Sequence, residues 1–396
     1  MYSTALSLTL PSLTSEQRQC LLKDGTLVSL FDVFATIPDP RSSHGLRYDL
    51  PFLLTCLVAA MLCNCDSTVA VAQWCREQRR LLARLFGPRR FLCPCDSLYR
   101  WLLPRLSAEH LEWALADWVR ATLVAADDDP IALDGKTVRG ASAAGHTAPH
   151  LLSFCTHQSQ EILLQVLVSE KTNEIPVAQA LLPCLPLAGR VCTADAMHTQ
   201  TDFLERVDAQ GGKTVLTVKK NQPTLYADLT TYFTDPLATY EQDSTCDYQR
   251  GRIERRTMKV TTAMNAYLSH WPPLAQVAQL TRTVTVRSTN KTTEEVVYLI
   301  TDLDPTAASP GRLLTLVRGH WTIENSLHYV RDVTFGEDRS QLRSGNAPHI
   351  MAALRNLVIT LIHRQGSNQI AATRRQVSYH PQQALKLLLH KRPSKL

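Results

Sequence analysis

The order of short apolar segments between residues 131 and 234 constrains the fold of this chain more than any other feature. Three strand-like runs come first, at residues 131–133, 151–156 and 162–168. Two later runs, at residues 190–194 and 214–218, alternate with helical patterns. The expected order is therefore three strands, and then helix, strand, helix, strand, helix. This order predicts an α/β domain in which helices flank a mixed sheet.

A mixed sheet with this order of elements is the layout of the RNase H-like fold. Helical patterns precede it, and Thr- and Val-rich strand patterns interrupt it before the helical patterns return. We therefore expect five parts along the chain: a helical N-terminal domain at residues 1–125, the first part of the core at 126–234, a β-rich insertion at 235–309, the last part of the core at 310–364, and a polar, basic tail at 365–396.

Two aspartates, Asp134 and Asp195, each follow one of the short apolar strands directly. If the first and fourth strands of the sheet are neighbours, the two carboxylates meet at one edge. Carboxylates held close together repel each other, and a divalent cation between them removes that cost. Mg²⁺ binds few carboxylates together with phosphate oxygens, which fits a phosphoryl-transfer site. The alternative interpretation is that each aspartate only forms a turn or caps a helix.

A third carboxylate is expected from the helical segment after the β-rich insertion. Glu324 is the candidate, one turn from His320 and on the same helical face as His328 and Arg331. The alternative interpretation is that Glu324 and Arg331 form an exposed ion-pair face, which is common on helices.

Three other acidic residues compete with Glu324 for this position. Asp332 lies eight residues further on, which is roughly 80° away around an α-helix. Gly336 is expected to end the helix, which would leave Glu337 and Asp338 in a loop. Because a metal ligand is held best on a rigid element, Glu324 is preferred, and Asp332 is expected to pair with Arg331 or a neighbouring helix.

Composition limits the class of protein without identifying it. The 42 basic and 36 acidic side chains give a charge of +6, which permits a polyanionic partner. The longest apolar run, residues 52–63, is shorter than the roughly 20 residues of a membrane span. Eleven cysteines and an N-terminus without a basic leader region indicate reduced thiols in a cytoplasmic protein. The tight Cys-x-Cys spacings at residues 63–65 and 93–95 favour buried thiols over a zinc site.

Several blocks of this sequence resemble, in order, the insertion-sequence transposases of the ISAs type, the H-repeat-associated proteins. The blocks are Ala132-Leu133-Asp134-Gly135-Lys136-Thr137, Glu170-Lys171-Thr172-Asn173-Glu174-Ile175, Thr193-Ala194-Asp195-Ala196-Met197-His198, Val218-Lys219-Lys220-Asn221-Gln222-Pro223 and Gly319-His320-Trp321-Thr322-Ile323-Glu324-Asn325. Residues 31–51 resemble the N-terminal associated domain of that family, and the resemblance extends to about residue 364.

The resemblance implies a DDE transposase whose catalytic triad is Asp134, Asp195 and Glu324. These residues would hold two Mg²⁺ or Mn²⁺ ions for in-line displacement at phosphorus. The expected partner is double-stranded DNA, both the element ends and the target, bound by a homodimer in a synaptic complex on the bacterial nucleoid. The helical N-terminal domain at residues 1–125 is expected to bind the DNA ends. A nuclease on the same fold, and an inactive or domesticated DNA-binding relic, are the alternatives.

Basic, polar and aromatic residues in these blocks and in the insertion are the candidates for DNA contacts, because phosphate contacts set affinity and register. They are Lys136, Arg139, His198, Lys219, Lys220, Asn221, Arg250, Arg252, Arg255, Arg256, His320, Trp321 and Arg331. The alternative for the arginines of the insertion is that they are solvated surface charge.

Overall fold

A computed structural model describes residues 22–23, 26–27, 29–44, 46–87, 93–123, 126–142 and 147–390 of the chain. The chain divides into two compact units. One unit comprises Met1–Leu123 together with Arg374–Leu396, and the other comprises Val124–Thr373. The basic end of the expected tail, from Lys391 onward, lies outside the described residues.

The first unit is built around α3, an apolar helix that is buried along nearly its whole length. Its helices are α2 (Leu30–Ala35), α3 (Leu50–Leu62), α4 (Thr68–Glu77), α5 (Arg79–Phe86), α6 (Asp96–Leu102), α7 (Ala108–Ala121) and α14 (Pro381–Leu389). α14 packs against α2 and α3, and Arg374 forms an ion pair with Asp66. Where the sequence analysis expected a polar tail, the chain therefore forms two helices, α13 (Ile370–Ser378) and α14.

The second unit contains one nine-stranded sheet with the order β5-β4-β3-β6-β7-β11-β10-β9-β8. Its first part is β3 (Ile131–Thr137), β4 (His150–Thr156), β5 (Ile162–Val168), α8 (Glu174–Leu181), β6 (Val191–Ala194), α9 (Thr201–Asp208), β7 (Lys213–Val218) and α10 (Pro223–Thr234). β3, β4 and β5 are antiparallel neighbours, whereas β3, β6 and β7 are parallel. The expected order of elements and the mixed sheet are confirmed.

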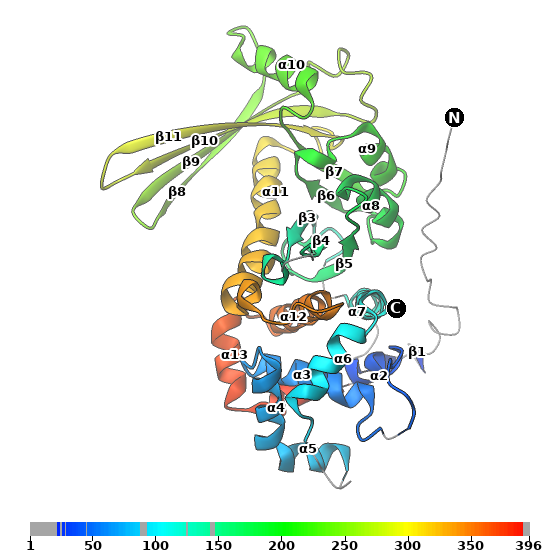
Figure 1. The fold of residues 1–396 in the computed structure, drawn as a ribbon. Helices are drawn as coiled ribbons and strands as arrows, with labels where there is room; N and C mark the ends of the chain where they lie inside the picture. The colour runs from blue at the N-terminus through cyan, green and yellow to red at the C-terminus, as the bar shows by residue number, and fades with distance from the viewer. Residues whose placement is uncertain are drawn as a thin grey trace, which may run out of the picture. The chain divides into compact units, whose positions relative to one another are not determined.

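The β-rich insertion extends this same sheet. Its strands are β8 (Glu241–Gln249), β9 (Arg252–Thr261), β10 (Gln276–Val286) and β11 (Lys291–Thr301). β11 pairs antiparallel with β7, which joins the insertion to the core. In Figure 1 the four strands run on as a twisted ribbon that projects from the core, and the side chains of their outer halves are largely exposed.

A long helical stretch follows the insertion. α11 (Pro310–Thr322) packs on the sheet and continues into two π-helical segments, η5 (Ile323–His328) and η6 (Val330–Thr334). Gly336 ends this stretch in a left-handed conformation (φ 61°), as expected for a C-terminal glycine. The short helix η7 (Glu337–Arg339) and the almost entirely buried α12 (Ala347–His363) complete the unit. Among the described residues, no helix combines the length and apolar character needed to cross a membrane.

Candidate metal centre

Asp134 and Asp195 extend from neighbouring parallel strands. Leu133 on β3 is in register with Ala194 on β6, so the two aspartates occupy the next position on each strand. Both are partly buried at this edge of the sheet. The first and fourth strands of the domain are thus adjacent, as the expected meeting of the two carboxylates requires.

A backbone N–H group fixes the orientation of each aspartate. The Oδ1 atom of Asp134 accepts a hydrogen bond from Gly135 N at 2.9 Å. The Oδ1 atom of Asp195 accepts one from Met197 N at 3.1 Å, where Asp195 caps the short helix η4 (Ala196–His198). Asp195 is therefore a helix cap, as the alternative interpretation expected. Only its Oδ1 atom takes part in the cap, and its Oδ2 atom does not.

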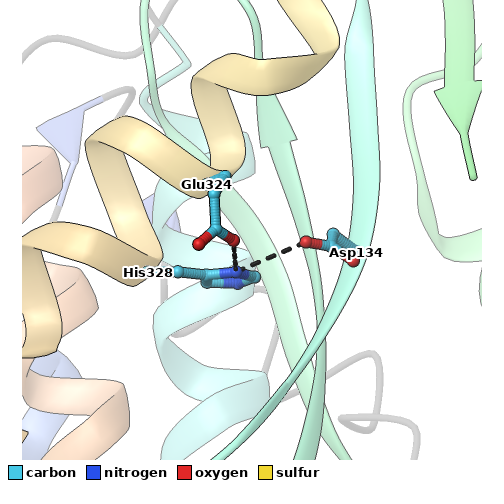
Figure 2. Close-up of side chains that lie close together, drawn as sticks. All are labelled: Asp134, Glu324 and His328. Carbon is cyan, nitrogen blue, oxygen red and sulfur yellow. Dashed lines mark hydrogen bonds and ion pairs between the residues drawn. The ribbon is translucent and has the colours of Figure 1, made fainter. Parts of the chain in front are cut away.

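Glu324 and His328 face Asp134 from the π-helical segment η5, as Figure 2 shows. His328 Nδ1 lies 3.0 Å from Glu324 Oε2 and 3.4 Å from Asp134 Oδ2. One ligand atom from each of the three side chains lies within 4.8 Å of the others. Among the described residues this is the one group of three or more such side chains that could hold a metal ion.

The electrostatics of this group follow from two carboxylates that share one imidazole. Burial lowers the pKa of His328, but hydrogen bonds with Asp134 and Glu324 outweigh it, so its pKa lies above the usual range. The hydrogen bond with His328 holds the pKa of Glu324 below its usual range, against a smaller opposing effect of burial. The His328 Nε2 atom is buried and has no hydrogen-bond partner among the described residues.

The π-helical geometry changes which residues face the strand. A π-helix closes its hydrogen bonds from residue i to i+5, so its turn is wider than that of an α-helix. The angle of about 80° expected between Glu324 and Asp332 assumed an α-helix and does not apply. Asp332 faces β3 as well, because its Oδ2 lies 2.6 Å from Lys136 Nζ.

The ion pair between Lys136 and Asp332 corrects two expectations. Lys136 was expected to contact DNA, but its side chain is largely buried and engaged with Asp332. Asp332 was expected to pair with Arg331 or a neighbouring helix, but its partner is on a strand. The reason is that Lys136 lies two residues after Asp134, so both side chains project from the same face of β3 toward the helix.

Arg331 is fully buried, so its expected role as a DNA contact is wrong. Its guanidinium pairs with Glu337 at 2.7 Å and donates to the Gln165 side-chain oxygen at 2.8 Å. Glu337 is also fully buried and pairs with Arg355 of α12 at 2.9 Å. Glu337 was expected to lie in a loop, but it lies in the short helix η7. The two arginines hold the pKa of Glu337 below its usual range, against the effect of burial. Arg331 therefore belongs to the ionic core of the unit.

His320 belongs to a hydrogen-bonded group of three side chains near the two aspartates. Its Nδ1 atom lies 3.1 Å from the hydroxyl of Thr193, which also lies 2.8 Å from His157 Nε2. Burial lowers the pKa of His320, although the nearby Asp134 and Asp195 act in the opposite direction. Burial, with a smaller contribution from His320, lowers the pKa of His157 to about 3. The expected DNA contact by His320 competes with this inward hydrogen bond.

His198 also points inward. Its side chain is 1% exposed, and its Nε2 atom lies 3.5 Å from Glu174 Oε2, which excludes the expected contact with DNA in this conformation. On its other oxygen, Glu174 is bonded to His150 Nε2 at 2.6 Å. Burial raises the pKa of Glu174, but the two histidines outweigh it and leave the pKa below the usual range.

The remaining candidates for DNA contacts differ in accessibility. Asn221 donates to the Ala196 carbonyl at 2.6 Å, which supports η4, and Arg256 lies in ion pairs with Asp247 and Glu254, each at 2.7 Å. Trp321 is 61% exposed, immediately before the segment that carries Glu324. The other exposed candidates are Arg139, Lys219, Lys220, Arg250, Arg252 and Arg255.

Two residues were not predicted as functional from the sequence. His328 was noted only as a neighbour of Glu324, although the four-residue spacing that brings both to Asp134 is visible in the sequence. Glu174 stood in a resembling block without an assigned role, because its contacts depend on the pairing of distant strands.

Comparisons with known proteins indicate the family to which the chain is similar. Residues 125–361 match the family described as "Transposase DDE domain", and residues 31–119 match "DDE_Tnp_1-associated". The chain is 27% identical over 347 residues to "Putative transposase YncI" of Escherichia coli O157:H7, covering 85% of this chain and 88% of that protein. It is 26% identical over 346 residues to "H repeat-associated putative transposase YhhI" of Escherichia coli strain K12, covering 85% and 90%.

Among solved structures, the chain is similar to a piggyBac transposase in a synaptic complex with hairpin DNA, with a TM-score of 0.47 and 11% identity over 90% of this chain and 79% of that one. The matched domain and the nine-stranded mixed sheet confirm the RNase H-like fold.

Proposed function

This chain belongs to the transposase DDE-domain family, and we propose that it binds the ends of an insertion sequence and catalyses metal-dependent DNA cleavage and strand transfer. The observation that carries the proposal is the meeting of Asp134, Glu324 and His328 within 4.8 Å, with Asp195 at the adjacent position of the neighbouring strand.

The side chains present fit a divalent cation. Asp134 and Glu324 offer carboxylate oxygens, the ligands that Mg²⁺ and Mn²⁺ prefer, and His328 adds an imidazole nitrogen. Asp195 lies outside this group of three and would add a further carboxylate from the end of the neighbouring strand. Two cations bound there would activate the attacking water or 3′-hydroxyl oxygen and neutralise charge on the leaving oxygen. The protein itself orients Asp134 and Asp195 through the Gly135 and Met197 N–H groups, and the π-helical segment η5 presents Glu324 to Asp134.

Exposed basic and aromatic side chains support the binding of DNA beside this centre. Lys219 and Lys220 follow β7, the strand next to the one that carries Asp195, and Arg139 lies shortly after β3. Such residues supply phosphate contacts that fix the position of the duplex without reading its sequence. Two DNA ends must be held together for strand transfer, so the proposed active form is a homodimer in a synaptic complex.

The test is single-turnover cleavage of a DNA fragment that carries the sequences flanking the gene. In Mg²⁺, Asp134→Asn, Asp195→Asn and Glu324→Gln should each abolish cleavage and retain DNA binding in gel-shift assays. Asp202→Asn is the matched control, since Asp202 is exposed on α9. Near-normal cleavage by Asp134→Asn would show that the site is wrongly assigned.

The same experiment separates the alternatives. Joining of the cut 3′ ends to a target plasmid identifies a transposase, and cutting without joining identifies a nuclease. Binding without cutting in both Mg²⁺ and Mn²⁺ identifies an inactive relic, which would contradict the proposal.

A further inference from the structure

Glu174 is a largely buried carboxylate that does not belong to the candidate metal centre. It is the first residue of α8, whose N-terminus is capped by Asn173 through a 3.1 Å hydrogen bond from Ile175 N. Only 13% of its side chain is exposed. Burying a charged carboxylate is costly unless hydrogen bonds satisfy it. The side chains that contact Glu174 therefore indicate what this residue does.

Two histidines from separate elements face this carboxylate, and one of them is hydrogen-bonded to it. His150 of β4 lies 2.6 Å from Oε1, and its other ring nitrogen lies 2.8 Å from the Thr137 hydroxyl at the end of β3. His198, the last residue of η4, lies 3.5 Å from Oε2. The side chain of Glu174 therefore lies between the end of the strand that carries Asp134 and the short helix that Asp195 caps.

Glu174 also occupies the space beside Gly135. A Cβ atom built at Gly135 would collide with the Glu174 carboxyl group, including both of its oxygens. The absence of a side chain at residue 135 thus lets the carboxylate lie directly against β3. Gly135 is the residue whose N–H group bonds the Asp134 carboxylate at 2.9 Å.

The N–H group that orients Asp195 also lies close to a residue that Glu174 faces. The N–H group that bonds the Asp195 carboxylate comes from Met197, at 3.1 Å, and the next residue is His198. Each N–H group that orients one of these aspartates therefore lies on, or next to, a residue that Glu174 contacts.

We propose that Glu174 is a positioning residue that fixes Asp134 and Asp195 relative to each other. The proposal rests on the proposed function, because it assigns the two aspartates to a shared cation site. Glu174 acts through Gly135 and His198, because its Oε1 atom is bonded to His150 and its Oε2 atom faces His198 Nε2 at 3.5 Å. Residues that orient metal ligands in this way typically contribute 10- to 100-fold in metal affinity or activity.

The test combines metal binding by the full chain with DNA cleavage. In calorimetric titrations with Mn²⁺, Glu174→Ala should weaken binding by about 10- to 100-fold, and Glu174→Gln, which keeps the shape of the side chain, should weaken it less. Single-turnover cleavage should fall in the same order while DNA affinity measured in Ca²⁺ is retained. Glu170→Gln is the control, because Glu170 is exposed on the same segment.

A double-mutant cycle tests the route through Gly135. Gly135→Ala should reproduce the decrease in Mn²⁺ affinity, because the added methyl group displaces the carboxylate. Adding Gly135→Ala to Glu174→Ala should then cost little more, since the space is already empty. If the effects of the two single variants simply add, Glu174 does not act through Gly135 and the proposal is overturned.

Two outcomes distinguish this proposal from the proposed function. If Glu174→Ala lowers the melting temperature but leaves Mn²⁺ affinity and the cleavage rate of folded protein unchanged, Glu174 is only structural, and the inference fails while the function stands. If Asp134→Asn itself leaves Mn²⁺ binding and cleavage intact, the proposed function fails first.

Discussion

Lys136 Nζ lies 2.6 Å from Asp332 Oδ2, and this ion pair connects β3 to the helical stretch that carries Glu324. Asp134 and Lys136 project from the same face of β3 and meet His328 and Asp332, which lie four residues apart on that stretch. The strand and the helix are therefore linked at two successive positions, of which only the first belongs to the candidate metal centre.

Exchanging the charges of this pair tests whether it holds the helix in place. Lys136→Asp and Asp332→Lys should each reduce the cleavage rate, because each puts two like charges together. The double variant should recover part of the rate, since the pair is restored in reverse. Asp332→Asn alone should leave measurable cleavage and mainly lower stability, because it removes the carboxylate that pairs with the largely buried Lys136. Absence of any recovery in the double variant, with folding checked by circular dichroism, would contradict a linking role.

Arg331 is expected to contribute to stability and not to DNA affinity. Its guanidinium is buried against Glu337 and Gln165, so Arg331→Ala leaves a buried carboxylate with one partner fewer. Breaking such a pair costs about 3–5 kcal/mol. Urea unfolding measures the destabilisation. Arg331→Lys should recover little of the lost stability, because a lysine ammonium cannot reproduce the contacts of the planar guanidinium with Glu337 and Gln165. A stable Arg331→Ala variant with weakened DNA binding would instead return Arg331 to the DNA surface.

The sequence predicted what depends on local pattern and missed what depends on distant pairing. Short apolar runs predict strands, so the element order followed from the sequence, whereas the meeting of Asp134 and Asp195 was expected only on the condition that β3 and β6 are neighbours, which the strand pairing fulfils. The burial of Arg331 did not, because arginine is mostly exposed and its partner Glu337 lies beyond a helix-ending glycine. The π-helical turns of η5 have no signature in apolar periodicity, which is why the direction of Asp332 was misjudged.

His157 should make the stability of the protein depend on pH. Its pKa in the folded protein is lowered to about 3 from an ordinary value of 6.5, so the unfolded chain binds a proton more readily. The stabilising effect of the neutral ring is complete above pH 6.5 and is lost as the pH falls toward 3, by up to about 1.4 kcal/mol per pH unit. His157→Gln should flatten this slope in urea unfolding between pH 6.5 and 4.5.

The matched control for this pH dependence is His270→Gln, because His270 is exposed. This variant should keep the slope of the unmodified protein. An equal slope for His157→Gln and the unmodified protein would mean that the imidazole of His157 is protonated in the folded state as readily as in the unfolded one.

The arginines of the β-rich insertion should divide into two classes. Arg250 lies in the exposed turn between β8 and β9, and Arg252 and Arg255 are exposed on β9. Their guanidinium groups are accessible to phosphates, whereas Arg256 is held in ion pairs with Asp247 and Glu254. Neighbouring residues of one strand project from opposite faces, which explains why Arg255 and Arg256 differ although they are adjacent.

Salt titrations of DNA binding distinguish these classes. Removing one phosphate interaction lowers the slope of log affinity against log salt concentration by about 0.9. Replacing Arg250, Arg252 and Arg255 by Ala should therefore reduce the slope by up to about three times this value, with little effect on the melting temperature. Arg256→Ala is the matched comparison: it should lower stability, because it leaves two acidic partners, and leave the slope unchanged. A slope that responds to Arg256→Ala but not to the triple change would assign the phosphate contacts to the ion-paired Arg256 and not to the exposed arginines.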